Sequence, residues 1–439
     1  MAIDRSIPPP VSDFRDISLN VPEPITLTNG MKMWIAGNGE DEINKLTIYM
    51  TGGGFQEKCP MQATACSMSV FNGNKNMTYS EIAEAIDYYG AWRALQVYDN
   101  CTAFALSSLN ENFDKTLPIF IDSLRFPVFP DNEFELNKRQ LAVNCATARE
   151  KVKYIANKEI LRLYYGEKHP LAVDPTPAHI SALTQEHMRD FYSSYYKAQN
   201  CNLVLAGRIT DKEIATVEDV MSEWLPDGEP SPLLEPEAMP TNQMLKIVNK
   251  DGAIQAAIVM MLPTVPRRHP DYIKLRLLAT VLGGYFGSRL MANIREDKGY
   301  TYGINASLSG RSFDGYIGIS TECDTKHCWN VIAETKKEMV RLCDEPIPDQ
   351  ELKVVKRHLL SDLVKTLDTP FNIAAYIGSM FCYGIYPTYF NDQVQEIIDA
   401  NSSDLLDVAK HYLDISKLRI VIACDKNSLP ECPVSMSKI

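Results

Sequence analysis

The 439-residue sequence repeats itself at a nearly constant separation, and this repeat limits the possible folds more than any other feature. Two patterns recur: a Pro-Asp-x-Glu segment followed by Lys-Arg-x-Leu, and a tyrosine followed by four apolar residues. They occupy residues 130–133, 138–141, 196 and 203–206 in the first half, and residues 348–351, 356–359, 412 and 420–423 in the second half. The separations are 218, 218, 216 and 217 residues. Two independent matches at nearly one offset predict two halves with the same fold.

A proline-rich segment lies between the two halves. Residues 226–240 contain five prolines, a composition typical of a linker. In each half, strand-like segments come in pairs and helical segments in runs, which favours a mainly antiparallel sheet with helices on one face. The sequence therefore predicts two homologous α+β domains, over residues 1–228 and 241–439, joined by a linker over residues 229–240.

The composition is that of a soluble globular protein with more than one core. Hydrophobic residues make up 45% and charged residues 23% of the chain, and 439 residues suffice for two or three domains. The net charge of -12 disfavours nucleic acid as a partner and is compatible with basic peptides. No run of eighteen apolar residues is present, so the sequence predicts no contact with a membrane.

The cysteines and the first residues indicate a compartment. Eleven cysteines, an odd number without regular spacing, are typical of reduced buried thiols rather than a disulfide framework. Residues 1–24 lack a basic start followed by an apolar run, so no secretory signal is expected. Both observations favour the cytoplasm.

The first strands are marked by a turn and a glycine run. Residues 25–27, 31–35 and 46–50 read as strands, and Asn29-Gly30 is a hairpin turn between the first two. A triple glycine at 52–54 is able to cradle an anion, but no Lys-Ser/Thr pair follows it. We therefore interpret it as the end of a strand.

Residues 283–303 predict a helix that ends and continues as a strand. Gly299 is well placed to end the helix in a left-handed conformation, after which Tyr300 and Tyr302 point the same way from an extended chain. Arg295 and Tyr302 then converge across the turn. A guanidinium and a phenol are fixed donors, suited to hold a peptide carbonyl or to stabilise an oxyanion.

Two interpretations of this pair remain open from the residues alone. In the simpler one, Arg295 makes a surface ion pair with a nearby carboxylate and Tyr302 packs. However, the order Phe-Gly-Ser-Arg-Leu at 286–290, Arg-Glu at 295–296 and Gly-x-x-Tyr at 299–302 resembles the second half of the insulinase, pitrilysin and mitochondrial processing peptidase family of zinc peptidases. The resemblance implies that Arg295 and Tyr302 reach a substrate near a zinc ion held by a different domain.

The same resemblance implies that the zinc site itself is lost. The family carries an inverted motif, His-x-x-Glu-His, in which two histidines bind zinc and the glutamate activates water. When the family's segment that follows this motif is aligned with residues 69–73 of this sequence, Thr64, Ser67 and Met68 fall at the His, Glu and His positions. Residues 141–146, where the last zinc-binding glutamate belongs, contain no carboxylate. We therefore expect no metal and no cofactor in this chain, and no peptidase activity from the chain alone.

Other reactive residues have simpler interpretations. Cys66 has no obvious histidine partner, so a buried structural thiol is preferred to a nucleophile. Cys323, His327 and Cys328 are metal-ligand types, but three ligands in so short a span rarely complete a tetrahedral site, so a loop entering a helix is preferred. His169 belongs to a His-Pro landmark of the family, and we assign it a structural role.

The resemblance therefore implies a non-catalytic, substrate-holding subunit of a zinc-dependent complex acting on peptides. In this interpretation Arg295 and Tyr302 act in trans, the partner is a homologous subunit with an intact zinc motif, and zinc resides in that partner. The alternative is a pseudoenzyme that associates with itself as a homodimer and has a structural or peptide-binding role without part in proteolysis.

Overall fold

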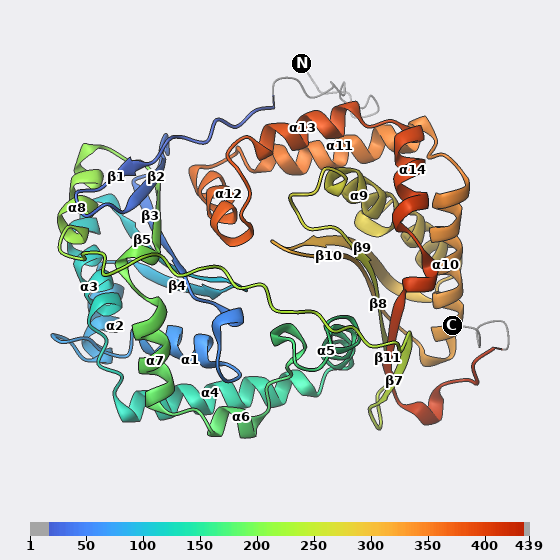
Figure 1. The fold of residues 1–439 in the computed structure, drawn as a ribbon, viewed down its shortest axis with the longest axis horizontal. Helices are drawn as coiled ribbons and strands as arrows, with labels where there is room; N and C mark the ends of the chain where they lie inside the picture. Colours follow the sequence, from blue (N-terminus) through green and yellow to red (C-terminus); the bar gives the residue numbers. More distant parts are fainter. Residues whose placement is uncertain (1–16, 434–439) are drawn as a thin grey trace, which may run out of the picture.

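The computed structural model describes residues 17–433. Residues 1–16, which include most of the segment where no secretory signal is expected, and residues 434–439 lie outside the described part. The structure has two lobes, each built on one sheet, and the chain passes from one to the other through residues 226–240 (Figure 1). The α+β class predicted from the sequence is confirmed.

The two sheets have the same strand order. The first sheet runs β1-β2-β6-β3-β5-β4 and the second runs β7-β11-β8-β10-β9, so that β1 is the only strand without a counterpart among the described residues. In each sheet the pair β2–β6 or β7–β11 is parallel and the other pairs are antiparallel. The strands are β1 (Ile25–Thr26), β2 (Lys32–Ala36), β3 (Ile43–Thr51), β4 (Trp92–Val97), β5 (Cys101–Leu109), β6 (Cys201–Gly207), β7 (Leu245–Asn249), β8 (Ala256–Thr264), β9 (Thr301–Gly310), β10 (Gly315–Cys323) and β11 (Arg419–Cys424). The common order supports the predicted equivalence of the halves, while their origin by duplication stays a prediction.

The predicted hairpin and strand end are confirmed. Strands β1 and β2 pair through Ile25 and Met33 on either side of the Asn29-Gly30 turn, and Gly30 has a φ of 85°. A side chain is disfavoured at this φ, which explains the glycine. Strand β3 ends directly before the glycine run at 52–54.

Most helices cover the outer face of each sheet. In the first lobe these are α1 (Gln62–Ser69), α2 (Tyr79–Tyr88), α3 (Phe113–Arg125), α4 (Asp131–Arg149), α6 (Pro177–Ser181), α7 (Gln185–Tyr195) and α8 (Asp211–Met221). In the second lobe they are α9 (Tyr272–Ala279), α10 (Cys328–Asp344), α11 (Asp349–Lys365), α13 (Tyr389–Asp399) and α14 (Ser402–Tyr412). No helix within residues 17–433 has the length and apolar character needed to cross a lipid bilayer.

Each sheet is covered on its inner face by a helix from the other half of the chain. Helix α12 (Pro370–Tyr383), from the second half, packs on β2 and β6, whereas α5 (Val152–Tyr165), from the first half, packs on β8 and β11 (Figure 1). The two sheets are therefore buried on both faces. This explains why residues 203–206 and 256–262 are continuous apolar runs rather than alternating ones.

The exchanged helix α12 is bounded by strong local signals. Thr369 accepts a hydrogen bond from the backbone N–H of Asn372, and Pro370 occupies the first turn, where its missing N–H costs nothing. Gly384 ends the helix with a φ of 64°. On the inner face, Phe381 lies edge-on to Trp34 with ring centroids 4.9 Å apart.

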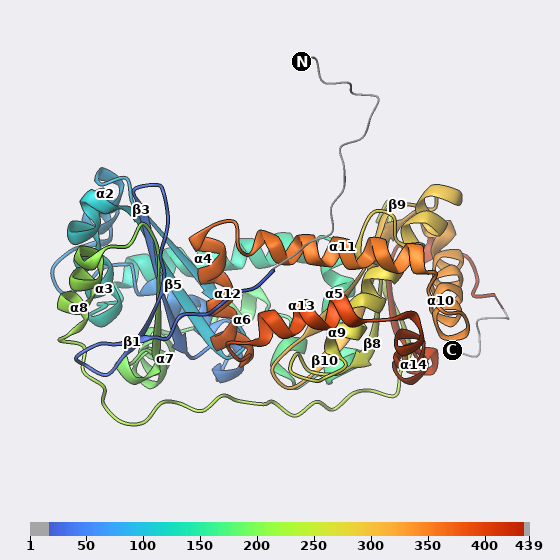
Figure 2. The ribbon, with the colours of Figure 1, turned by 90° about the horizontal axis from the view of Figure 1, so that it is seen from above.

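The segment at 226–240 is extended and fixed to both lobes. It runs along one side of the molecule, as seen from above in Figure 2. Asn100, in the turn between β4 and β5, exchanges two hydrogen bonds with the backbone of Leu234, at 2.8 and 3.0 Å. The N–H of Met239 donates to the carbonyl of Tyr165 at 2.8 Å. The boundaries predicted around this segment remain a prediction, and α5 and α12 pack across them.

The two lobes also meet through corresponding hairpin turns. Asp99, between β4 and β5, forms an ion pair with Arg311, between β9 and β10. Nearby, the imidazole of His169 is buried and stacks on Tyr165 with ring centroids 4.4 Å apart. Burial lowers the pKa of His169, and its Nδ1 accepts a hydrogen bond from the N–H of Leu171. These contacts agree with the structural role assigned to His169.

Candidate functional site

The predicted helix-to-strand turn forms the first part of the site. The helix ends in a wide π-helical turn over Met291–Asp297, and the N–H of Lys298 donates to the carbonyl of Asn293. Gly299 follows with a φ of 63°, so the predicted left-handed end is confirmed. A π turn has one residue more than an α turn, a feature frequent at functional sites.

Tyr302 lies on the outermost strand of the second sheet. As the second residue of β9 it is 91% exposed, and its hydroxyl has no hydrogen bond within the described residues. Tyr300 is partly buried and stacks on His327, with ring centroids 4.5 Å apart. The two tyrosines thus have different surroundings, and Tyr302 is the one available to a ligand.

Arg295 lies beside an exposed aromatic ring. Its guanidinium is 4.7 Å from the centroid of Phe286, which is 63% exposed. Within residues 17–433 the Arg295 side chain forms no ion pair or hydrogen bond. The structure therefore supports neither part of the simpler interpretation: Arg295 is not in a surface ion pair and Tyr302 is not packed.

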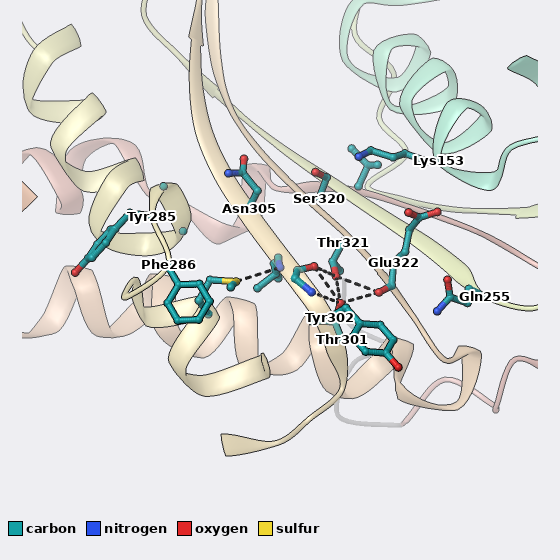
Figure 3. Close-up of a pocket in the computed structure, with 16 residues that line it drawn as sticks. Lys153, Gln255, Tyr285, Phe286, Thr301, Tyr302, Asn305, Ser320, Thr321 and Glu322 are labelled. Atoms are coloured by element: carbon teal, nitrogen blue, oxygen red, sulfur yellow. Dashed lines mark hydrogen bonds between the residues drawn. The ribbon is translucent and has the colours of Figure 1, made fainter. Parts of the chain in front are cut away.

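A cavity of about 580 Å³ opens beside Tyr302 and Phe286 (Figure 3). Gly283 and Gly284, from a second π-helical turn, form part of its wall. A Cβ on Gly283 would come within 2.6 Å of the backbone nitrogen of Ala306, so only glycine lets the helix approach β9 this closely. Phe286 thus links the two predicted residues, since Arg295 stacks on it and Tyr302 lines the same cavity.

The paired strands β9 and β10 form one wall of this cavity, and two charged side chains line it. Thr301 Oγ1 lies 2.8 Å from Thr321 Oγ1 and donates to the carbonyl of Glu322 at 2.7 Å, where the pairing of β9 and β10 shifts register. Glu322 and Lys153 both line the cavity, the first from β10 and the second from α5 (Figure 3). The cavity therefore presents one carboxylate and one ammonium group beside an exposed phenol, a set suited to a polar chain such as a peptide.

The three degenerate zinc positions lie on α1, in the first lobe. Ser67 is buried, donates to the carbonyl of Ala63 at 2.6 Å and lies 2.7 Å from the hydroxyl of Tyr196. Met68 packs against the core of the first lobe, and Thr64 lines a cavity of about 420 Å³. A hydroxyl engaged in this way and a thioether are poor zinc ligands. The residues present do not fit the family's metal.

The remaining candidates have structural surroundings. Within residues 17–433, no three His, Cys, Asp or Glu side chains are grouped in a way that would hold a metal ion, and His327 stacks on Tyr300. The Cys66 thiol is buried and donates to the carbonyl of Met188, and burial raises its pKa. Because the thiolate is the nucleophile, this environment disfavours reactivity.

Glu57 is a residue that the sequence does not single out. Its carboxylate accepts hydrogen bonds from the backbone N–H groups of Met61 and Ala63, at 3.2 and 2.9 Å, at the start of α1. Burial raises its pKa to about 7, although these hydrogen bonds act in the opposite direction. The only local signal is an acidic residue shortly before a helix, which is too common to be informative.

This raised pKa predicts a pH-dependent stability. The folded state holds a proton between pH 4.5 and 7 that the unfolded state has released, so the free energy of unfolding falls as the pH rises through this range. Glu57→Gln keeps an acceptor oxygen without charge. We expect it to be more stable than wild type at pH 8, by up to about 3 kcal/mol, and equally stable near pH 4.

Urea denaturation at both pH values tests this prediction, with the exposed Glu84→Gln as the matched control. A Glu57→Gln protein that is less stable than wild type at pH 8 would show that the hydrogen bonds to the carboxylate outweigh its burial.

Residues 182–359 match the family described as the peptidase M16 inactive domain. An uncharacterized zinc protease of Rickettsia felis is 25% identical over 344 residues, 77% of this chain and 82% of that protein. A Helicobacter pylori protein named non-peptidase homolog YmxG is 22% identical over 397 residues, 86% and 88% of the two chains.

The fold is shared with solved structures. A peptidase M16 inactive domain from Pseudomonas fluorescens superposes with a TM-score of 0.85 at 21% identity, covering 94% of this chain and all of the other. A protease from Helicobacter pylori gives a TM-score of 0.82 at 17% identity, covering 92% and 100%. Together with the motifs at 286–302, these matches show that residues 182–359 carry the inactive-type domain of the peptidase M16 family, within a chain that shares the fold of the solved structures.

Proposed function

We propose that this chain is a non-catalytic, substrate-holding subunit of a zinc-dependent peptidase complex. Arg295 and Tyr302 hold the scissile peptide, and a homologous partner with an intact zinc motif hydrolyses it. The observation that carries the proposal is the free state of both groups: the Arg295 guanidinium has no carboxylate partner within residues 17–433, and Tyr302 is almost fully exposed.

A purely structural role does not account for these two groups. An exposed phenol on a strand edge and an arginine beside an exposed Phe286 add little to stability, because neither buries a new surface or forms an ion pair. Their donors remain available to a carbonyl oxygen. The helix end and the strand fix the backbone from which each side chain extends, which limits the positions that the two donors can reach.

The adjacent cavity supports a peptide as the ligand. It is lined by the edge strand β9 and by opposite charges at Lys153 and Glu322. Main-chain groups on an edge strand bind extended peptides, and nearby side chains then select among them. In the first lobe, Thr64, Ser67 and Met68 supply neither zinc ligands nor a base, so hydrolysis falls to the partner.

The test is reconstitution with a homologue from the same genome that carries an intact His-x-x-Glu-His motif. We expect the purified chain alone to contain less than stoichiometric zinc and to cleave no peptide, and the mixture to cleave a peptide faster than the partner alone. Metal analysis of each protein, gel filtration of the mixture and a fluorogenic peptide library provide the three measurements. A chain that forms only homodimers, and that leaves the partner's turnover unchanged, would support the self-associating pseudoenzyme instead.

A further inference from the structure

Two cysteines from opposite halves of the chain meet where α12 crosses the first sheet. Cys101 is the first residue of β5, and Cys382 lies near the end of α12. Their Sγ atoms are 3.1 Å apart, although the residues are 281 positions apart in sequence. Both are free thiols, with 4% and 6% of their surface exposed.

The pair is close to the geometry of a disulfide. A covalent S–S bond is about 2.05 Å long, so the two sulfur atoms need to approach by roughly 1 Å, within reach of small side-chain rotations. The backbone around both residues is held in regular structure: Cys101 pairs with Thr51 in the first sheet, and Cys382 is in the last turn of a helix. Such positions keep the two thiols facing each other.

A cavity leads to one member of the pair. Cys382 lines a space of about 380 Å³ between the lobes, together with Tyr383 and the turn residues Asp99 and Arg311. Cys101 does not line it. The pKa of the Cys101 thiol is raised by its hydrogen bond with Cys382 and by burial. Because Cys382 lines the cavity and Cys101 does not, a small reagent that enters the cavity reacts first with Cys382.

We propose that Cys101 and Cys382 form an oxidation site at which a small-molecule disulfide converts two thiols into a disulfide joining the halves. The Cys382 thiolate attacks one sulfur of the reagent, releases its other half as a thiol and forms a mixed disulfide. The Cys101 thiolate then attacks Sγ of Cys382 and releases the second small thiol. Two electrons and two protons pass from the cysteines to the reagent, which is thereby reduced to two thiols.

The bond would fasten α12 to the first sheet. Without the disulfide, α12 is held there by non-covalent contacts, among them the packing of Ile377 and Phe381. A disulfide closing so long a loop restricts the unfolded chain strongly. Oxidation is therefore expected to raise the thermal midpoint by roughly 5 °C, and a reducing agent should reverse the change.

The experiment uses the full chain and oxidised glutathione at pH 8. After incubation the remaining thiols are alkylated in denaturant, and the protein is digested without reduction. Mass spectrometry should find one cross-linked peptide pair containing Cys101 and Cys382. In Cys101→Ala the reaction should stop at glutathione bound to Cys382, whereas Cys382→Ala should leave Cys101 unmodified while the protein stays folded.

Two outcomes would overturn the proposal. One is a wild-type chain in which both thiols are still alkylated after prolonged oxidation. The other is a cross-link that instead joins Cys323 to Cys328, two buried cysteines that lie next to each other within the second half. Both measurements use the unmodified sequence, so the result stands even if either alanine variant folds poorly. Circular dichroism before and after oxidation establishes that the chain remained folded.

Discussion

In the complex proposed above, we expect Arg295→Ala and Tyr302→Phe each to lower the turnover of a peptide by about 10²- to 10³-fold. Loss of one donor to a developing oxyanion raises the barrier by about 2.7 to 4 kcal/mol. Tyr302→Phe removes only a hydroxyl that forms no hydrogen bond with the described residues, on a side chain that is 91% exposed, so we expect a negligible effect on folding. Affinity between the subunits should change little, because neither group is needed for the fold.

Matched controls separate a role in holding substrate from a general effect on the surface. Arg139→Ala and Tyr88→Phe make the same changes at exposed positions on α4 and α2. Turnover is measured at saturating partner, and zinc content is measured in every preparation. If Arg295→Ala and Tyr302→Phe both retain full turnover, the trans role is excluded and the pseudoenzyme becomes the better explanation.

Ile377→Ala should lower the free energy of unfolding by about 2 to 5 kcal/mol. Ile377 has none of its surface exposed and packs on the inner face of the first sheet, among Trp34, Val204 and Ala206. Ile377 lies on α12, which belongs to the second half of the chain but packs on the first sheet. Truncating its side chain should therefore also loosen the first sheet. Hydrogen exchange should accelerate in β2 and β6 more than in β8 and β10.

Ile254→Ala is the control, since this isoleucine is 94% exposed and the same truncation there should change stability by less than about 0.5 kcal/mol. Exchange that increases only in the second sheet of Ile377→Ala would contradict the assignment of α12 to the first sheet.

The sequence predicts the strands well because their signal is local. Residues 203–206 and 256–262 are apolar throughout, and such an unbroken run by itself indicates burial on both faces of a sheet. It does not indicate what covers the second face. Ile160 and Ile377 lie in ordinary amphipathic helices, and nothing in their spacing says that each helix packs on the opposite sheet.

In the candidate site too, features that depend on nearby residues can be predicted from the sequence, whereas contacts between distant residues cannot. Gly299 and the seven-residue separation of Arg295 and Tyr302 are visible in the sequence, and the structure confirms the turn between them. The meeting of Lys153 and Glu322 in one cavity depends on α5 crossing to the second sheet, a contact between residues far apart along the chain. Such a contact between the halves forms only after the lobes have packed, so the spacing of residues in the sequence carries no record of it.

The reciprocal packing of α5 and α12 makes the halves obligate partners. Either half expressed alone would leave the inner face of its sheet bare and its own exchanged helix without a surface to cover. Two copies that traded entire halves would bury the same surfaces as two separate monomers, which is the condition for domain swapping. The segment at 226–240, which joins the two halves, is held by Asn100 and Tyr165. Both anchoring residues belong to the first half of the chain, so an exchanged pair would keep these contacts and would differ from the monomer in the path of the chain beyond them.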